Sequence, residues 1–574
     1  MSEGKQSRVF LAVAVAAAAA FAVMMFMRKG EDARPARAPA PTAQQATQNS
    51  HGPQAPVSTA EQRRVLRAQR AAAERTLRIE TPEYIATVTN LNASVRHFEM
   101  KNRRYDEHGR HRDLVTTQLE EYLPLRTELG GVNVPEDAIW QMQALSPQAV
   151  LFTYEGGGFR VERKLEAGRG PYQLWSTIRI TNLGEHARPV RVNLSTHHYV
   201  RNAEESTSFI NVGNRSPALS RGLCRHGDSI AREPHDKSSG FAHRYHDVTF
   251  AGVDNTYFAN VMATEGTVAE SCRIVTDPRM AHVGDEDPDG FLFSSSLIYP
   301  RVTLAPREST TVRSLAYMGP KTPDTLSAAG HHLNDVVDLG WFAMIANVLV
   351  KLLSIIHGFV GNWGLAIIVL TLLVKLILFP LTLPQVKSMA KMRALKPEMD
   401  RINALYGDDR EKKAAATMEL HRKNGVNPVA GCLPQLLQLP IWWALYASLS
   451  SNIELFRAPF GGWLQDLSAP DPYFIMPLLL GALMVVQQRI TPQTTMDPVQ
   501  AKMMMYMMPV MITVLMLFLP QGLTLYMFTN SALGIAQQRF IEYRLKNHPE
   551  LMAQQGATSN APPAIQSGGS SAKK

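Results

Sequence analysis

Lys375 is the residue whose surroundings most require a chemical explanation, because it is a cation within a long apolar stretch. Seventeen uncharged residues, 358–374, precede it, and apolar residues continue to Leu383. A lysine at the centre of a membrane-spanning helix costs ~2.5–3.5 kcal/mol. Either the side chain extends to the headgroups, or it occupies a hydrated cavity and attracts an anionic group. Thr371, one helical turn earlier, favours a polar stripe, but this helix alone supports both interpretations equally.

Other uncharged segments contribute amides and hydroxyls but no acidic partner for this cation. The segment that begins at Pro428 carries Gln435 and Gln438, and the final apolar segment carries Thr524 and Thr529. Each could be explained by ordinary hydrogen bonds between membrane helices. Together with Lys375 and Thr371 they predict a polar, positively charged substrate groove, which suits an acidic group that arrives from outside the protein.

Enzyme, metal and cofactor chemistry are not indicated by the sequence. It contains no GxSxG, HExxH, P-loop or GxGxxG pattern, and we expect no catalytic residues, no metal and no cofactor. The predicted membrane spans carry no Asp, Glu or His, which argues against an ion-coupled transporter. Of three cysteines, Cys224 and Cys272 lie in the water-soluble part. They would form a disulfide in an oxidising compartment, or remain as two buried thiols.

The elements that must position these residues are apolar helices. The chain has 574 residues and a mean hydropathy of −0.13, but its apolar residues are concentrated in long uncharged runs, such as 424–453 and 503–538. A bilayer-spanning helix needs about 20 apolar residues. The sequence therefore predicts an α-helical polytopic membrane protein with six transmembrane helices: an anchor in 1–29 and spans at 358–384, 428–449, 472–488, 503–519 and 522–538.

The remaining segments are expected to be linkers, loops and a soluble domain. Residues 76–330 alternate apolar and polar side chains in short runs without intervening helical patterns, which favours an all-β sandwich of antiparallel strands. Residues 150–154 and 159–163, around Gly156–Gly158, read as a hairpin, and residues 175–180 and 190–194 repeat that pattern. The other predicted segments are a flexible linker (30–75), an interfacial amphipathic helix (331–357), a helical hairpin (385–427), a loop (450–471) and a basic tail (539–574). We expect Pro384 to end the span that precedes the hairpin.

The distribution of charge predicts the orientation. The 385–427 hairpin carries ten Lys or Arg against six acidic residues, and the tail from Arg539 carries five against two. The 451–471 loop has one basic residue and three acidic residues. Because cytoplasmic loops collect Lys and Arg, we expect the hairpin, the tail and both termini inside, and the loop and the β-domain outside. The basic excess then reflects topology and anionic phospholipids, not DNA.

The C-terminal region resembles the YidC family of bacterial membrane-protein insertases, which work in the inner membrane. The β-domain matches mainly by architecture and by Tyr317–Lys321. The sequence motifs that carry the resemblance are Phe359-Val-Gly-Asn-Trp-Gly364, Phe379-Pro-Leu-Thr382, Ser388-Met-Ala-Lys-Met392, Val426-Asn-Pro428, Gly431-Cys-Leu-Pro434, Gln438-Leu-Pro-Ile441, Ala458-Pro-Phe460 and Asp466-Leu-Ser468.

The resemblance implies a five-helix insertase core, a periplasmic β-sandwich and a hydrophilic groove with a basic residue at the position of Lys375, where many members have arginine. It implies partners as well: nascent membrane proteins, the Sec translocon, and the ribosome and signal-recognition pathway. Clients would first meet the hairpin through its methionines, Met389, Met392 and Met399. The alternatives are a polytopic channel or transporter, or a sugar-binding periplasmic domain on a membrane anchor.

Overall fold

A computed structural model describes residues 73–547, except 118, 136–137, 202–219, 235–241, 278–289, 341, 408, 425–427 and 491–497. The predicted anchor in 1–29, nearly all of the predicted linker and the end of the tail therefore lie outside the described residues. The helical hairpin within residues 394–426 forms one compact unit, and the β-domain with the other helices forms a second. Each unit is described by itself.

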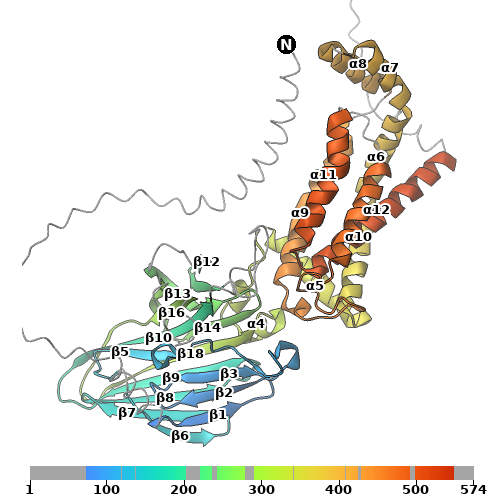
Figure 1. Ribbon diagram of the computed structural model, residues 1–574. Coiled ribbons are helices and arrows are strands. Elements are labelled where there is room, and N and C mark those ends of the chain that lie inside the picture. The colour runs from blue at the N-terminus through green and yellow to red at the C-terminus, as the bar shows by residue number, and fades with distance from the viewer. Residues whose placement is uncertain are drawn as a thin grey trace, which may run out of the picture. The chain divides into compact units, whose positions relative to one another are not determined.

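The β-domain is built from antiparallel strands throughout the described pairs, as predicted (Figure 1). A four-stranded sheet has the order β1-β2-β3-β4, and the larger sheet runs β17-β10-β16-β15-β13-β14-β18-β9-β8-β7-β6, with β11, β12 and β5 attached. The main apolar cluster of the β-domain includes Phe98, Phe152 and Phe250, each fully buried, and Phe293 belongs to a separate small cluster. The strands are β1 Thr76–Glu80, β2 Tyr84–Thr89, β3 Val95–Met100, β4 Arg112–Asp113, β5 Arg126–Gly130, β6 Gln141–Ser146, β7 Ala149–Gly156, β8 Phe159–Ala167, β9 Gln173–Asn182, β10 Arg188–Arg201, β11 Arg221–His226, β12 Ser229–Pro234, β13 Ala242–Asp254, β14 Phe258–Glu265, β15 Ala269–Asp277, β16 Gly290–Ile298, β17 Val302–Leu304 and β18 Ser309–Pro320.

One of the two predicted hairpins is confirmed and the other is wrong. Strands β7 and β8 pair across a turn in which Gly157 and Gly158 have φ of 57° and 80°, values that glycine adopts without steric cost. In contrast, β9 pairs with β8 and β18, whereas β10 pairs with β16, β17 and β5. The turn after Asn182 therefore joins strands that do not pair with each other. A turn motif indicates where a strand ends, but it does not determine which other strand that strand pairs with.

Strand β10 carries two adjacent histidines, His197 and His198, and the first of them is buried in the sheet. His197 is 8% exposed, and its Nδ1 lies 2.8 Å from Ser294 Oγ on the neighbouring strand β16. Burial lowers the pKa of His197 to about 3, and the charge of Arg126 acts in the same direction. The ring is therefore neutral at pH 7 and serves the packing of the sheet.

The two cysteines of the β-domain are bonded to each other. Cys224 on β11 and Cys272 on β15 form a disulfide that joins positions 48 residues apart. Both cysteines are fully buried in the apolar cluster. The disulfide is the first of the two alternatives that the sequence left open.

The helices of the larger unit are α4 Pro323–Ala329, α5 Ala343–Val360, α6 Trp363–Ala394, α9 Pro428–Ser451, α10 Ile475–Ile490, α11 Pro498–Met516 and α12 Gln521–Asn547. Among the described residues, Ala343–Val360 and Trp363–Pro380 are long and apolar enough to cross a membrane, and Ile475–Ile490 and Met505–Met516 are shorter apolar segments. The short 3-10 helices are η1 Arg103–Tyr105, η2 Glu120–Tyr122, η4 Leu333–Val336 and η5 Ile453–Leu455.

The prediction that Pro384 ends its helix is wrong, because α6 continues to Ala394. A proline inside a helix removes one hydrogen bond, to the carbonyl four residues earlier, at a cost of ~3 kcal/mol. The residues that follow include Met389, Ala390, Lys391 and Met392, which are good helix formers. The C-terminal helix likewise passes the predicted end at 538 and runs to Asn547, since a loss of hydrophobicity does not itself stop a helix.

The helical hairpin consists of α7 Lys396–Leu405 and α8 Arg410–Lys423. Two helices joined by a turn at Gly407 agree with the sequence pattern. The N-cap of α8 is Asp409, whose side chain accepts a hydrogen bond from the backbone N–H of Lys412.

We expect the Cys224–Cys272 disulfide to stabilise the β-domain. A cross-link between residues 48 positions apart restricts the unfolded chain, and the entropic model gives ~4 kcal/mol. Replacing both cysteines by alanine should lower the free energy of unfolding of this domain in the purified protein, as followed by calorimetry. A reductant should destabilise the wild type and leave the double variant unchanged; equal stability of the two proteins would contradict this role.

Neutral His197 should make the β-domain sensitive to acid. Its pKa falls from 6.5 to about 3 on folding, so below pH 6.5 the unfolded chain binds more protons and stability is lost as the pH falls. Between pH 7 and 4.5 this group should cost ~2–3 kcal/mol. We expect His197→Asn to reduce the pH dependence of the thermal transition and His186→Asn, at an exposed position, to leave it unchanged. If the thermal transition of both variants depends on pH in the same way, His197 does not make the β-domain sensitive to acid.

Candidate functional site

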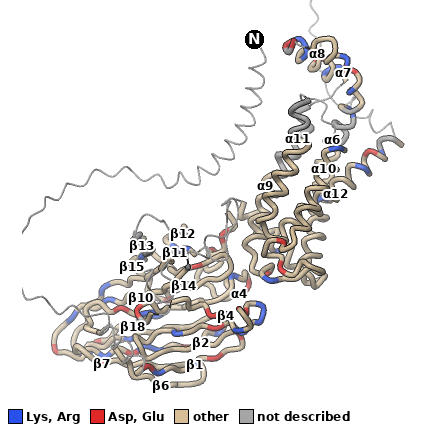
Figure 2. The backbone as a smooth tube through the Cα atoms, in the orientation of Figure 1, with Lys and Arg blue, Asp and Glu red and all other residues tan. Residues whose placement is uncertain are grey.

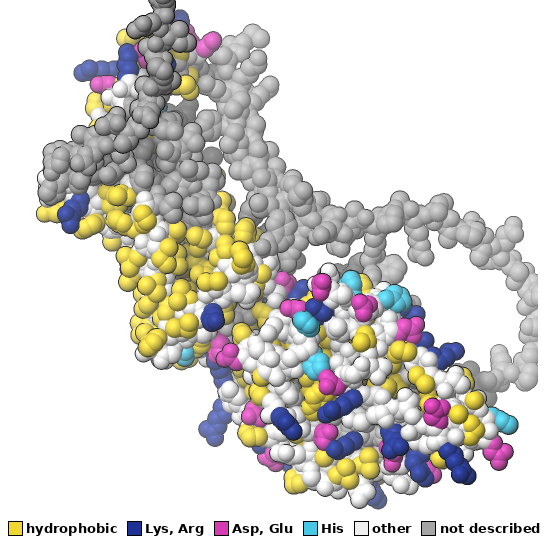
Figure 3. Space-filling view, turned by 180° about the vertical axis from the view of Figure 1, so that it is seen from behind, with side chains coloured by type: hydrophobic (Ala, Val, Ile, Leu, Met, Phe, Trp, Pro, Cys, Tyr) yellow, Lys and Arg dark blue, Asp and Glu magenta, His cyan; other side chains and the backbone are white. Residues whose placement is uncertain are grey.

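The helical region is apolar on its surface as well as in its core. Figure 3 shows hydrophobic side chains over the described helices, whereas the β-domain displays charges of both signs. Figure 2 gives the same contrast along the backbone: α9 and α11 are nearly free of charge where they are described, and charges gather on α7 and α8. Exposed apolar side chains on α6, α10 and α11 include Leu376, Ile377, Leu478, Val510 and Met511. A continuous surface of this kind is typical of protein that contacts lipid.

Lys375 lies within this apolar region, near the middle of α6. Its side chain is half-buried, and among the described residues it forms no ion pair with a carboxylate. Its Nζ approaches the neighbouring helix α12 at Gly534, where a Cβ atom would lie 3.6 Å from Nζ and 3.9 Å from Nε2 of Gln487 on α10. Three helices, α6, α10 and α12, therefore meet at this cation.

The threonines predicted for the groove are buried and use their hydroxyl protons within their own helices. Thr371 donates to the carbonyl of Ile367 at 2.6 Å, and Thr529 donates to the carbonyl of Leu525 at 2.8 Å. Thr524 lies 3.4 Å from the carbonyl of Pro520 and is 1% exposed. These hydroxyls satisfy backbone groups inside a packed bundle, and what they offer a ligand is a spare oxygen lone pair.

The other predicted contact residues are only partly described. Gln435 and Gln438 belong to α9, but their side chains lie outside the described residues, as does that of Met389. Met392 and Met399 are buried, with exposures of 8% and 5%. The apolar side chains that the hairpin exposes are those of Leu405 and Met418, at 75% and 74%.

Two residues at the meeting point of α6, α10 and α12, Gln487 and Gly534, were not predicted from the sequence. A hydrogen bond from Nε2 of Gln537 on α12 to Oγ1 of Thr382 on α6, at 2.5 Å, was not predicted either. Gln487 stood at the end of the predicted span 472–488, and its amide was the available signal. Gly534 offered none, because its role depends on which helix faces it.

A second region links the helices to the β-domain. Residues 452–471, which make up most of the connection between α9 and α10, form what we call the docking loop. The side chain of Phe456 is 6% exposed, and its ring centroid lies 4.9 Å from that of Tyr257 and 5.9 Å from that of Phe258. Arg104 of η1 donates from Nε to the carbonyl of Phe456 at 2.6 Å and pairs with the carboxylate of Glu454 at 3.3 Å.

Buried charges secure the same domain to the segment that leads into α5. The carboxylate of Asp254 is fully buried and binds Lys321 and Arg221, the latter at 3.0 Å. Arg221 also pairs with Asp338, five residues before α5, at 3.1 Å. Burial by itself would raise the pKa of Asp254, but the charges of Lys321 and Arg221 outweigh burial and hold that pKa below its ordinary value. The network is therefore ionic at neutral pH.

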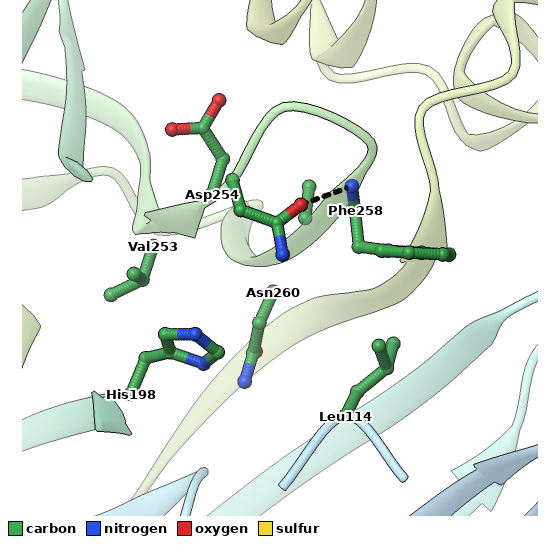
Figure 4. A pocket seen from close by; sticks show the side chains of 8 residues that line it. Leu114, His198, Val253, Asp254, Phe258 and Asn260 are labelled. Carbon is green, nitrogen blue, oxygen red and sulfur yellow. Dashed lines mark hydrogen bonds between the residues drawn. The ribbon is translucent and has the colours of Figure 1, made fainter. Parts of the chain in front are cut away.

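A small pocket in the β-domain adjoins this network. It is lined by His198, Asp254, Asn260 and Phe258, among others (Figure 4). Its volume is about 20 Å³, enough for one water molecule and far too little for a sugar ring. Burial lowers the pKa of His198 to about 4, so this ring is neutral as well. In the described part of the chain, no group of three or more His, Cys, Asp or Glu residues is arranged to hold a metal ion.

An antiparallel β-domain joined to apolar helices, two of them long and apolar enough to cross a membrane among the described residues, defines a class: membrane proteins with a large extramembrane domain. Two family models match this chain in order. The "YidC periplasmic domain" covers residues 76–352, and the "60Kd inner membrane protein" covers residues 355–548. The chain belongs to the YidC family of membrane protein insertases, proteins of the inner membrane that are not enzymes.

Relatives that align with most of this chain are named as members of the same family. A membrane protein insertase YidC from Anaeromyxobacter dehalogenans is 35% identical over 489 residues, which cover 82% of this chain and 85% of that protein. The protein of the same name from Geobacter metallireducens is 32% identical and covers 88% and 93%. The relative from Aromatoleum aromaticum is 47% identical over 43% of this chain and 44% of its own length.

Solved structures are similar to this chain as well. The crystal structure of an active YidC insertase with its first transmembrane domain resolved has a TM-score of 0.34 and 20% identity, and covers 80% of this chain and 91% of that one. A putative aldose 1-epimerase from Escherichia coli K12 has a TM-score of 0.31 and 12% identity, and covers 43% and 99%.

The aromatic contact of Phe456 should hold the docking loop against the β-domain. Phe456→Ala would remove a buried ring, a change that costs ~3–5 kcal/mol in a protein core. We expect faster hydrogen exchange in residues 452–468 and around Arg104, measured on the intact protein. Trp463→Ala removes a ring that is 38% exposed from the same loop and should leave exchange nearly unchanged. Equal exchange in both variants and the wild type would refute the docking role.

Proposed function

We propose that this insertase receives the polar tail of an incoming membrane protein at Lys375 and releases the apolar segment sideways into lipid. The observation that supports this is the cation itself. It lies in an apolar helical region and, among the described residues, no carboxylate pairs with it. A lysine in such a place is expensive, and an acidic or carbonyl group from a client would offset that cost.

The groove that we propose is formed by Lys375, Thr371, Gln435, Gln438, Thr524 and Thr529. The bundle would lower the cost of bringing a short polar tail below the membrane surface, with the ammonium as the main attraction. Threonine oxygens whose protons are already used can accept hydrogen bonds from the N–H groups of the tail. The client's apolar segment would then leave toward lipid, where burial gains ~25 cal/mol per Å² of apolar surface. This gain drives the tail outward without a nucleotide.

We further propose a topology in which the β-domain, the docking loop and the ends of α5 lie on one side of the membrane. Asp338, before α5, pairs with Arg221 of the β-domain. Asn362, just after α5, donates to the carbonyl of Phe460 in the docking loop at 3.0 Å. A crossing helix of 18 residues would separate its ends by ~27 Å. Contacts of both ends with periplasmic elements support an α5 that lies along the interface.

We also propose on which side of the membrane the other segments lie. Five spans after the N-terminal anchor place the α7–α8 hairpin, the basic tail and both termini in the cytoplasm. There the exposed Leu405 and Met418 of the hairpin, together with Met389, would meet nascent chains, whereas Met392 and Met399 are buried. The Sec translocon, the ribosome and signal-recognition pathway, and anionic phospholipids are the partners that we propose.

The charge of Lys375 can be tested by reconstitution. We expect purified Lys375→Arg in liposomes to insert a small single-span client at a rate close to that of wild type, because the charge remains. Lys375→Glu should insert about tenfold less, as the loss of ~1.4 kcal/mol of attraction predicts. Insertion would be measured by protease protection of the client, with thermal melting as the folding control. Equal insertion by all three proteins would refute the charge role.

A further inference from the structure

Gly534 of α12 differs from the other glycines at helix contacts. A Cβ atom at Gly481 would overlap Thr513, and one at Gly364 would overlap Phe460. Those two glycines are required by close packing. At Gly534 the nearest atoms to a Cβ would be Nζ of Lys375 at 3.6 Å and Nε2 of Gln487 at 3.9 Å, which is ordinary contact distance. Packing alone would therefore accept an alanine.

A glycine inside a helix costs ~1 kcal/mol relative to alanine, so its presence in α12 needs another reason. What it provides is space at one place, directly beside the ammonium of Lys375. A longer side chain would extend into the surroundings of Nζ and occupy the position of a ligand. The bare backbone of α12 leaves the cation approachable from the side on which the amide of Gln487 also lies.

We propose that Gly534 is a specificity-determining residue: it keeps Nζ of Lys375 open to a carboxylate of the client's polar tail, with Gln487 alongside as a second polar contact. This inference rests on the proposed function of Lys375 and adds the position of the client. The nitrogen groups that converge here are an ammonium and an amide. A carboxylate fits beside them, because it accepts hydrogen bonds through two oxygens and carries the charge opposite to that of the ammonium.

The experiment uses the full-length protein in liposomes and two single-span clients that differ only in an Asp-rich or an Asn-rich tail. Gly534→Glu would supply an internal carboxylate beside Lys375, and Gly534→Gln has the same shape without the charge. We expect Gly534→Glu to insert the Asp-tailed client about tenfold less than Gly534→Gln does. Ala536→Gln, on an exposed position about 200° around the helix, should stay within about twofold of wild type. Equal insertion by the Glu and Gln variants would overturn the proposal.

A cross-link provides a second measurement that does not require a bulky substitution. In a Cys432→Ala background, Gly534→Cys should form a disulfide with a client that has one cysteine in its tail, and Ala536→Cys should not. Equal cross-linking at both positions would overturn the proposal. Lys375→Glu is assayed in parallel: if it is inactive while the Gly534 variants behave as wild type, the function of Lys375 stands and the inference about Gly534 fails. If Lys375→Glu is fully active, the proposed function itself fails.

Discussion

The function that we propose depends on one electrostatic constraint: a positive charge in an apolar bundle without an acidic partner among the described residues. Lys375 sits near the middle of α6, where its long side chain alone does not place the ammonium in bulk water. Such a charge persists only if something compensates for it. The nearby groups from α10 and α12 are an amide and a bare glycine backbone, so the compensation that we propose comes from water and from the client.

The threonines proposed for the groove are arranged so that their hydroxyl groups cost little when no client is bound. Thr371 and Thr529 donate to carbonyls of their own helices, which removes the cost of buried hydroxyl protons. The same hydroxyls retain lone pairs for a ligand. The end of the bundle next to the β-domain is held differently, by the aromatic contact of Phe456 and by the charge network of Asp254, Lys321 and Arg221. That contrast fits a protein that is firmly joined to its periplasmic domain and adaptable around its cation.

Sequence alone located the features that are expressed in single residues or short runs. A cation in an apolar run revealed Lys375, and two glycines revealed the turn between β7 and β8. It failed where the outcome depends on distant partners: the turn after Asn182 does not disclose that β10 pairs with β16, and His197 is buried because of that pairing. Pro384 misled because one lost hydrogen bond does not end a helix that its neighbours favour. The role that we propose for Gly534 could not be predicted from the sequence, because it depends on the residues of α6 and α10 that lie next to it.

The most direct test of the central claim is an exchange of charge between insertase and client. Insertion of single-span clients with an acidic or a basic tail would be measured in liposomes that contain either the wild type or the Lys375→Glu variant. The account predicts that the wild type prefers the acidic tail and that the variant prefers the basic one. If both proteins insert the two clients with the same preference, the charge of Lys375 does not receive the client.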